Sequence, residues 1–179
     1  LKLPFINDKI KATVREQVIN AFGGNFAEII IGGAAFNQEV EQFLRMIDLP
    51  YTVGYGMTEC GPLVSGLPPK YFKRRSCGAP VPGMEAKIDN PNEKGEGEIL
   101  VRGENVMMGY YKNEEATRVA LTEDGWLRTG DLGYVDEEGF LFFTGRSKNL
   151  IILSNGENVA PEQLENMFED ETIISDILV

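Results

Sequence analysis

Two glycine-rich segments of this chain combine residue types that can bind a nucleotide. The first is IGGAA at 31–35, whose backbone can approach a flat ligand closely because glycine has no Cβ. Its candidate contacts are Gly32, Gly33 and Ala34. The second is GYGMTE at 54–59, which offers the ring of Tyr55, the hydroxyl of Thr58 and the carboxylate of Glu59. A purine can lie between IGGAA and the ring, while the hydroxyl can bond a phosphate and the carboxylate can hold Mg²⁺, which prefers oxygen ligands.

Each segment alone also has a purely structural interpretation. Gly32 and Gly33 can form a tight turn, and Thr58 with Glu59 can form an irregular cap. Short motifs of this kind occur often by chance, so neither segment decides between the two interpretations.

The elements around these segments follow an α/β pattern. Apolar residues at helical spacing predict a helix over 8–22, and Ile29 to Ile31 has the β-branching of a buried parallel strand. Asn37 can cap a second helix, and LPYTVGYG then predicts a second short strand. The core face of the second helix is predicted to be Val40, Phe43, Leu44 and Ile47. Both glycine-rich segments should open at the carboxyl ends of parallel strands, where α/β sheets bind ligands.

The pattern changes after Pro62. MEAKI, GEILVRG and GFLFFTG are strand candidates separated by turn-rich stretches, and Asn113 can cap a short helix over 113–121. This part predicts a small, mostly antiparallel β-barrel or sandwich. KNLIILSNGENV then predicts two short strands around Ser154-Asn155-Gly156, followed by a helix that begins at Pro161. The sequence therefore predicts three domains: residues 1–70, residues 71–147, and the start of a small α+β domain at residues 148–179.

Composition excludes several classes of function. The net charge of −11 argues against a nucleic-acid-binding surface. The chain has no His, so mechanisms that need His as the base are excluded, and its two Cys lack metal-like spacing. A reduced, cytoplasmic setting is expected. The apolar runs are too short for a transmembrane segment.

Three further motifs follow in order: GEILVRGENVMMGYY (97–111), GWLRTGDLGYVD (125–136) and GRSKNLIILSNGENVAPEQLE (145–165). With them, nearly the whole chain resembles the adenylate-forming superfamily of acyl-CoA synthetases, peptide-synthetase adenylation domains and luciferases. The last motif is most similar to that of the long-chain fatty acyl-CoA synthetases.

The resemblance implies roles for individual residues. The implied nucleotide-binding residues are Gly32, Gly33, Ala34, Tyr55, Gly56, Thr58, Asp131 and Arg146. Thr58 would bond the α-phosphate, Glu59 would hold Mg²⁺, and Asp131 would accept both ribose hydroxyls. Arg146 would contact the ribose and phosphate region, which makes Thr58, Glu59 and Arg146 the catalytic candidates.

The same resemblance implies roles outside the nucleotide site. Lys148 matches the hinge of a mobile C-terminal domain, and Gly156 matches a loop that moves against the channel for CoA. One wall of the acyl pocket is expected to contain the residues beside the phosphate-binding pair: Gly54, Gly61, Pro62 and Leu63. Structural alternatives stay open for three residues. Asp131 can be a turn residue, Arg146 an ion-pair partner, and Lys148 a solvated linker residue.

The implied reaction joins a fatty acid to CoA through acyl-AMP, with ATP and Mg²⁺. The expected partners are a small-molecule carboxylic acid, ATP and CoA, with no nucleic acid and with membrane contact only peripheral, through the fatty acid. Two alternatives remain: a ligase that acylates a carrier protein, or a non-catalytic nucleotide-binding domain.

The family's phosphate loop and its catalytic C-terminal lysine have no match between Leu1 and Val179. The chain is therefore expected to be a fragment. By itself it should show only background ATP–pyrophosphate exchange.

Overall fold

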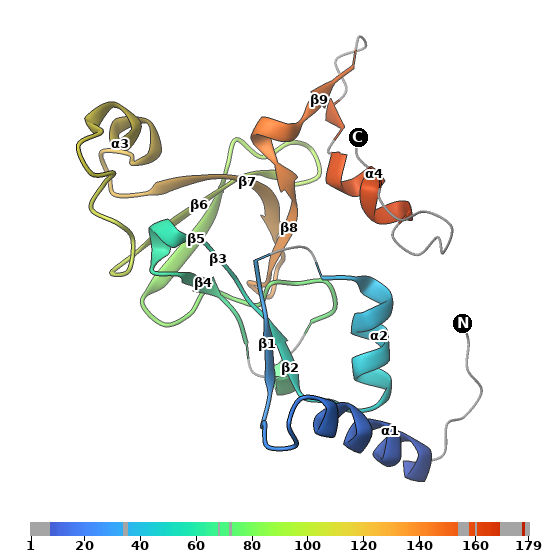
Figure 1. The fold of residues 1–179 in the computed structure, drawn as a ribbon. Coiled ribbons are helices and arrows are strands. Elements are labelled where there is room, and N and C mark those ends of the chain that lie inside the picture. The colour runs from blue at the N-terminus through green and yellow to red at the C-terminus, as the bar shows by residue number, and fades with distance from the viewer. Residues whose placement is uncertain are drawn as a thin grey trace.

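The computed structural model describes residues 8–33, 36–67, 69–71, 73–153, 158–159, 161–168 and 177. Its N-terminal part is a small α/β unit, in which two helices lie beside two short strands (Figure 1). The strands β1 (Ile29–Ile31) and β2 (Tyr51–Val53) are parallel, with Ile30 opposite Thr52. The predicted parallel sheet is confirmed for these two strands.

Both predicted helices of this unit are present. α1 is Asp8–Ala21 and α2 is Gln38–Met46. The side-chain oxygen of Asn37 accepts hydrogen bonds from the backbone N–H groups of Glu39 and Val40, at 2.9 and 3.0 Å. The predicted cap is therefore confirmed, and it satisfies two donors that a helix N-terminus leaves open.

A small apolar core holds the α/β unit together. Its buried members are Leu44, Ile47, Leu49 and Tyr51. The predicted apolar faces of the two helices are buried only in part. The exposed members are Ile10 and Phe22 near the ends of α1, and Val40 and Phe43 of α2. Ile30 is 76% exposed, so the prediction of a fully buried strand is wrong. Within the described residues, β1 pairs with β2 alone, and no second layer covers the face that carries Ile30.

A bent hairpin carries the GYGMTE segment. β3 (Tyr55–Gly56) pairs antiparallel with β4 (Leu63–Ser65), and the 3₁₀ turn η1 (Thr58–Cys60) lies between them. The backbone N–H of Met57 donates to the carbonyl oxygen of Pro62 at 2.8 Å. This bond closes the hairpin and fixes where η1 begins.

The middle of the chain forms one antiparallel sheet in the order β5-β6-β7-β8. Its strands are Met84–Asp89, Gly97–Gly103, Leu127–Val135 and Leu141–Arg146. The antiparallel arrangement is confirmed. In the described part of the chain β5 and β8 are free edges, so the expected barrel is an open sheet. Four strands are too few, since roughly five are needed before a small barrel begins to close.

The pattern of apolar residues did not indicate strand β7. Gly130 has φ +72, a left-handed conformation that favours glycine, and Gly133 faces the neighbouring strand closely. A Cβ at Gly133 would collide with the carbonyl oxygen of Phe142 on β8. The strand therefore needs glycine where an alternating strand pattern would show side chains.

The remaining elements are short. They are the 3₁₀ turns η2 (Pro69–Tyr71) and η3 (Ser147–Asn149), helices α3 (Glu114–Ala120) and α4 (Pro161–Phe168), and strands β9 (Ile151–Ile152) and β10 (Asn158–Val159). Asn113 accepts a hydrogen bond from the N–H of Ala116 at 3.0 Å, which confirms the predicted cap of α3. β9 and β10 pair antiparallel and α4 begins at Pro161, both as predicted. The predicted turn at 154–156 lies outside the described residues.

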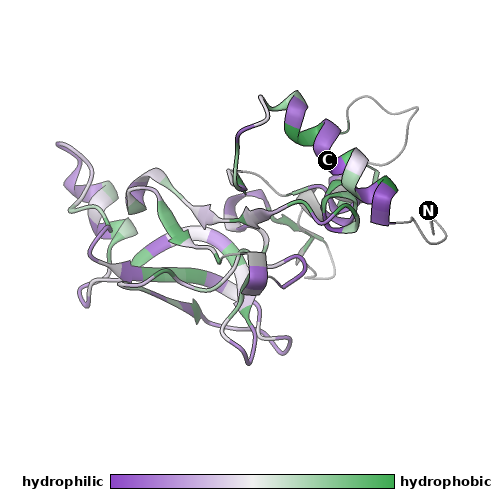
Figure 2. Ribbon diagram, turned by 90° about the horizontal axis from the view of Figure 1, so that it is seen from below, coloured by the Kyte–Doolittle hydropathy of each residue, from purple (hydrophilic) through white to green (hydrophobic). Residues whose placement is uncertain are grey.

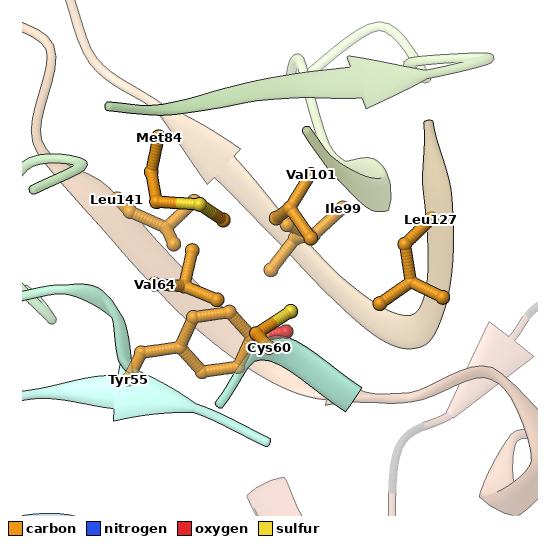
Figure 3. Close-up of a cluster of buried hydrophobic side chains, with 8 residues drawn as sticks. All are labelled: Tyr55, Cys60, Val64, Met84, Ile99, Val101, Leu127 and Leu141. Carbon is orange, nitrogen blue, oxygen red and sulfur yellow. The ribbon is translucent and has the colours of Figure 1, made fainter. Parts of the chain in front are cut away.

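The main core joins the hairpin to the four-stranded sheet. Figure 3 shows its eight buried side chains pointing toward one another: Tyr55, Cys60, Val64, Met84, Ile99, Val101, Leu127 and Leu141. Hydrophilic and hydrophobic residues both occur along the strands and helices (Figure 2), as expected for elements that bury one side. Burying a large apolar side chain contributes about 1.5–3 kcal/mol, so this cluster anchors the GYGMTE segment firmly. Of the helices described, none has the length and hydrophobicity to cross a bilayer.

Cys60 should be chemically inert in the folded protein. Its side chain is fully buried, and this burial, with the nearby charge of Glu59, raises the pKa of its thiol to about 11. Because the thiolate is the reactive form, iodoacetamide at about pH 8 should leave Cys60 unmodified in a Cys77→Ser variant until urea unfolds the protein. Mass spectrometry of native and unfolded samples measures this, and rapid labelling of the native sample would contradict the buried placement.

Candidate functional site

The two glycine-rich segments meet at one edge of the parallel strands. The backbone N–H of Gly54 donates to the carbonyl oxygen of Ile31 at 2.8 Å. A Cβ at Gly32 would lie 3.2 Å from the carbonyl oxygen of Gly54, and Gly33 has φ +92, which favours glycine. The segments after β1 and β2 therefore lie side by side, as expected. Ala34 lies outside the described residues.

Asp131 is the buried charge of the site. Its carboxylate, with the residue only 2% exposed, accepts a hydrogen bond at Oδ2 from the Tyr55 hydroxyl at 2.7 Å. Nε of Arg146 lies 3.2 Å from Oδ1, because Asp131 on β7 is directly opposite Arg146 on β8. Three residues from distant parts of the sequence thus come together. The interpretation of Asp131 as a turn residue is wrong, and Arg146 is an ion-pair partner whose own side chain remains largely exposed.

Tyr55 has both its ring and its hydroxyl constrained. Burial, and then the charge of Asp131, raise the pKa of the hydroxyl far above its usual value, so it remains a donor to the carboxylate. Only 9% of the residue is exposed, and the ring belongs to the main core with Val64 and Cys60 (Figure 3). The core therefore leaves only a small part of Tyr55 exposed to a ligand.

Thr58 and Glu59 lie on η1, where Thr58 is exposed and Glu59 is half-buried. Oε1 of Glu59 accepts a hydrogen bond from the hydroxyl of Tyr110 at 2.9 Å, and this bond raises the pKa of Tyr110. Tyr110 belongs to the MMGYY motif, but sequence reasoning gave it no role. It lies outside the helices and strands, so no periodicity could indicate which way its side chain points.

Glu59 supplies the only predicted metal contact. In the described part of the chain, no group of three or more His, Cys, Asp or Glu side chains could hold an ion. Mg²⁺ commonly binds through one or two carboxylates together with substrate phosphates, rather than in an all-protein cage. The half-buried Glu59 carboxylate beside the exposed Thr58 hydroxyl fits that mode of binding, in which a nucleotide supplies the other oxygens.

An open cavity of about 680 Å³ adjoins these residues, which is within the usual size of ligand pockets. It lies between α3, the start of β7 and η3, and its lining includes Tyr110, Arg128, Gly130 and Lys148. Asp131 and Glu59 do not line the cavity themselves, but two lining residues are next to them: Gly130 precedes Asp131, and Tyr110 contacts Glu59. The hydroxyl of Ser147 donates to the carbonyl oxygen of Gly130 at 2.9 Å, which ties η3, and with it Lys148, to β7.

The acyl-pocket candidates are grouped in the hairpin. A Cβ at Gly54 would lie 3.2 Å from Cδ1 of Leu63, and Gly61 ends η1 with φ +56, immediately before Pro62. Leu63 is exposed, which leaves it available to a ligand. Their role stays a prediction. Gly156, the candidate for the CoA channel, lies outside the described residues.

Comparison with known families defines the class of protein. The model of the family described as AMP-binding enzyme matches residues 6–111, which is more than half of the chain and contains both glycine-rich segments. The chain belongs to the AMP-binding enzyme family.

Curated relatives narrow the comparison. Long-chain-fatty-acid–CoA ligase FadD15 of Mycobacterium bovis is 42% identical over 159 residues, which cover 89% of this chain and 26% of that protein. Long-chain-fatty-acid–CoA ligase ACSBG2 of Xenopus laevis is 40% identical over 83% of this chain and 20% of its own length. Long chain acyl-CoA synthetase 1 of Arabidopsis thaliana is 37% identical over 91% of this chain and 26% of its own length. The chain spans about a fifth to a quarter of the length of these relatives.

Solved structures show the same fold. O-succinylbenzoate coenzyme A synthetase from Bacillus subtilis, in complex with ATP and magnesium ion, has a TM-score of 0.78 at 33% identity, covering 94% of this chain and 36% of that one. Its complex with the acyl-adenylate intermediate also has a TM-score of 0.78, at 32% identity, covering 92% of this chain and 36% of that one. ATP-bound MatB from Rhodopseudomonas palustris has a TM-score of 0.67 at 30% identity, covering 79% of this chain and 29% of that one.

Proposed function

We propose that the complete protein carrying this chain is an ATP-dependent, AMP-forming ligase that activates a fatty acid and transfers it to CoA. The observation that carries the proposal is the buried Asp131 carboxylate, held between the Tyr55 hydroxyl and Arg146 beside the two glycine-rich segments. The relatives named as long-chain-fatty-acid–CoA ligases support the substrate class. The ATP and acyl-adenylate complexes of the structural neighbours support the nucleotide chemistry.

The nucleotide would be held by groups that match its parts. Asp131 can accept hydrogen bonds from two neighbouring ribose hydroxyls, because a carboxylate accepts through both oxygens. The backbone of Gly32 and Gly33 would lie against one face of the adenine, with Tyr55 on the other side. The guanidinium of Arg146, which is always charged, suits the α-phosphate together with the Thr58 hydroxyl.

The two chemical steps make modest demands on side chains. In the first, a carboxylate oxygen of the acid attacks the α-phosphorus of ATP and the bond to pyrophosphate breaks. In the second, the CoA sulfur attacks the acyl carbon, loses its proton, and AMP leaves. The protein contributes mainly positioning and charge neutralisation, which is consistent with a chain that has no His. Mg²⁺, when bound through Glu59 and the nucleotide phosphates, would offset their negative charge.

The domain limits, the setting and the mobile parts belong to the same proposal. Residues 1–70, 71–147 and 148–179 would contribute to a nucleotide-binding body, a β-sheet subdomain and a mobile C-terminal domain. Lys148 would be the hinge between the last two, and Gly156 would lie in the loop beside the CoA channel. The two cysteines are free, which fits a reduced cytoplasmic setting. Contact with a membrane would be peripheral and would come through the fatty acid.

The acceptor of the acyl group is the decisive measurement. The complete protein is offered ATP, Mg²⁺, carboxylic acids of increasing chain length, and either CoA or a phosphopantetheinyl carrier protein. We expect acyl-CoA from the longer acids, detected by mass spectrometry, and no acylated carrier. Acylated carrier without acyl-CoA would instead identify a carrier-protein ligase. Absence of ATP–pyrophosphate exchange with every acid would favour a non-catalytic nucleotide-binding domain.

A further inference from the structure

The segment that follows β6 holds the hairpin at three points. The backbone N–H of Met107 donates to the carbonyl oxygen of Glu59 at 2.7 Å. Nδ2 of Asn105 donates to the carbonyl oxygen of Leu63 at 2.8 Å, and the hydroxyl of Tyr110 donates to Oε1 of Glu59 at 2.9 Å. Glu59 is therefore restrained through its backbone and its side chain by the same segment, residues 105–110.

Tyr110 is itself anchored to helix α3. Its backbone N–H donates to Oγ1 of Thr117 at 2.9 Å, and that hydroxyl donates to the carbonyl oxygen of Asn113 at 2.8 Å. Gly109 allows this close approach, because it has φ +148 and a Cβ there would lie 2.8 Å from Cγ2 of Thr117. The backbone of Tyr110 is thus held in position by contacts that do not involve Glu59.

We infer that Tyr110 is a positioning residue that orients the Glu59 carboxylate for Mg²⁺. The hydrogen bond from Tyr110 to Oε1 restrains the orientation of the carboxylate, which would contact an ion held on the nucleotide phosphates. Groups that hydrogen-bond a metal ligand in this way commonly alter metal affinity or activity by about ten- to a hundredfold. The inference rests on the proposed function, because it assumes that Glu59 contacts the ion.

The position of Tyr110 fits this role better than a purely structural one. The residue is 40% exposed and lines the open cavity, and its hydroxyl bonds Glu59 and is not buried in the core. Its neighbour Tyr111 is 88% exposed, and Nζ of Lys112 lies 5.2 Å from the centroid of the Tyr111 ring. Tyr111 therefore provides a matched tyrosine whose hydroxyl can be removed without touching Glu59.

The test compares Tyr110→Phe with Tyr111→Phe in the complete protein. Electron paramagnetic resonance measures binding of Mn²⁺, as a substitute for Mg²⁺, in the presence of a non-hydrolysable ATP analogue. ATP–pyrophosphate exchange gives the half-saturating Mg²⁺ concentration, and thermal unfolding gives the melting temperature. For Tyr110→Phe we expect Mn²⁺ binding to weaken and the half-saturating Mg²⁺ concentration to rise, each about tenfold, with both unchanged for Tyr111→Phe.

A structural role for Tyr110 would give a different pattern: a lower melting temperature with unchanged metal dependence. That result would overturn the inference and leave the proposed function intact. If the wild-type protein shows no exchange at all, the proposed function fails and the inference fails with it. Should Tyr110→Phe not fold, Thr117→Val tests the same point through the anchor of Tyr110. It should shift the metal dependence in the same direction by a smaller factor, and an unchanged dependence would overturn the inference.

Discussion

Replacing Asp131 by alanine should raise the KM for ATP about a hundredfold or more in the complete protein. The carboxylate would accept two ribose hydroxyls, and a hydrogen bond to a charged group contributes about 1.5–3 kcal/mol. Since about 1.4 kcal/mol corresponds to a factor of ten, losing two such bonds accounts for this increase. The rate of ATP–pyrophosphate exchange, measured as a function of ATP concentration, gives this KM.

The same substitution should also lower the free energy of unfolding. The buried hydroxyl of Tyr55 would lose its acceptor, and a buried donor left without a partner costs about 1–3 kcal/mol. A double variant, Asp131→Ala with Tyr55→Phe, removes both groups. It should recover part of the stability in urea unfolding but none of the affinity for ATP, which separates the structural contribution of Asp131 from its contact with ribose.

Asp136→Ala is the matched control for the loss of an ion-paired aspartate. Asp136 lies in the turn between β7 and β8, and its carboxylate is 2.6 Å from Nζ of Lys73. This variant should lose some stability and keep the KM for ATP of the wild type. An unchanged KM in Asp131→Ala, or an equal increase in Asp136→Ala, would contradict the assignment of Asp131 to the ribose.

Local signals in the sequence predicted the elements that have local causes. Asn37 and Asn113 marked two helix starts because a side-chain oxygen satisfies open backbone donors wherever it precedes a helix. Ile29 to Ile31 indicated a strand through its β-branched residues. Asp131 and Arg146 are different, because they meet only through the pairing of β7 with β8. The family resemblance implied a separate role for each residue, and neither it nor any periodicity predicted that the two would pair.

The features that sequence reasoning missed depend on contacts between distant segments. Gly130 and Gly133 interrupt the side-chain pattern of strand β7. Gly130 has a left-handed φ of +72, and the need for Gly133 appears only when β8 is beside it. The exposure of Ile30 depends on which layers cover β1, and its β-branched side chain carries no information about that. The contact of Tyr110 with Glu59 joins a loop to a 3₁₀ turn, and neither has a repeat from which side-chain direction could be inferred.

Gly56→Ala is expected to be the most disruptive single-methyl change in the hairpin. A Cβ at Gly56 would collide with the carbonyl oxygen of Pro62, and that oxygen also accepts the N–H of Met57 at 2.8 Å. Relief of the clash therefore requires movement of the backbone that carries Thr58 and Glu59. Overpacking typically costs about 1–3 kcal/mol, and a displacement of about 1 Å at a reacting site can lower a rate about a hundredfold.

Gly66→Ala shows whether this effect comes from the collision or from added bulk alone. A Cβ at Gly66 would meet its nearest neighbour, Cα of Gly54, at an ordinary 3.8 Å. We expect Gly66→Ala to retain nearly wild-type stability and exchange activity, whereas Gly56→Ala lowers both, as measured by urea unfolding and ATP–pyrophosphate exchange. Equal effects of the two substitutions would mean that the close approach of Gly56 to Pro62 does not set the position of Thr58 and Glu59.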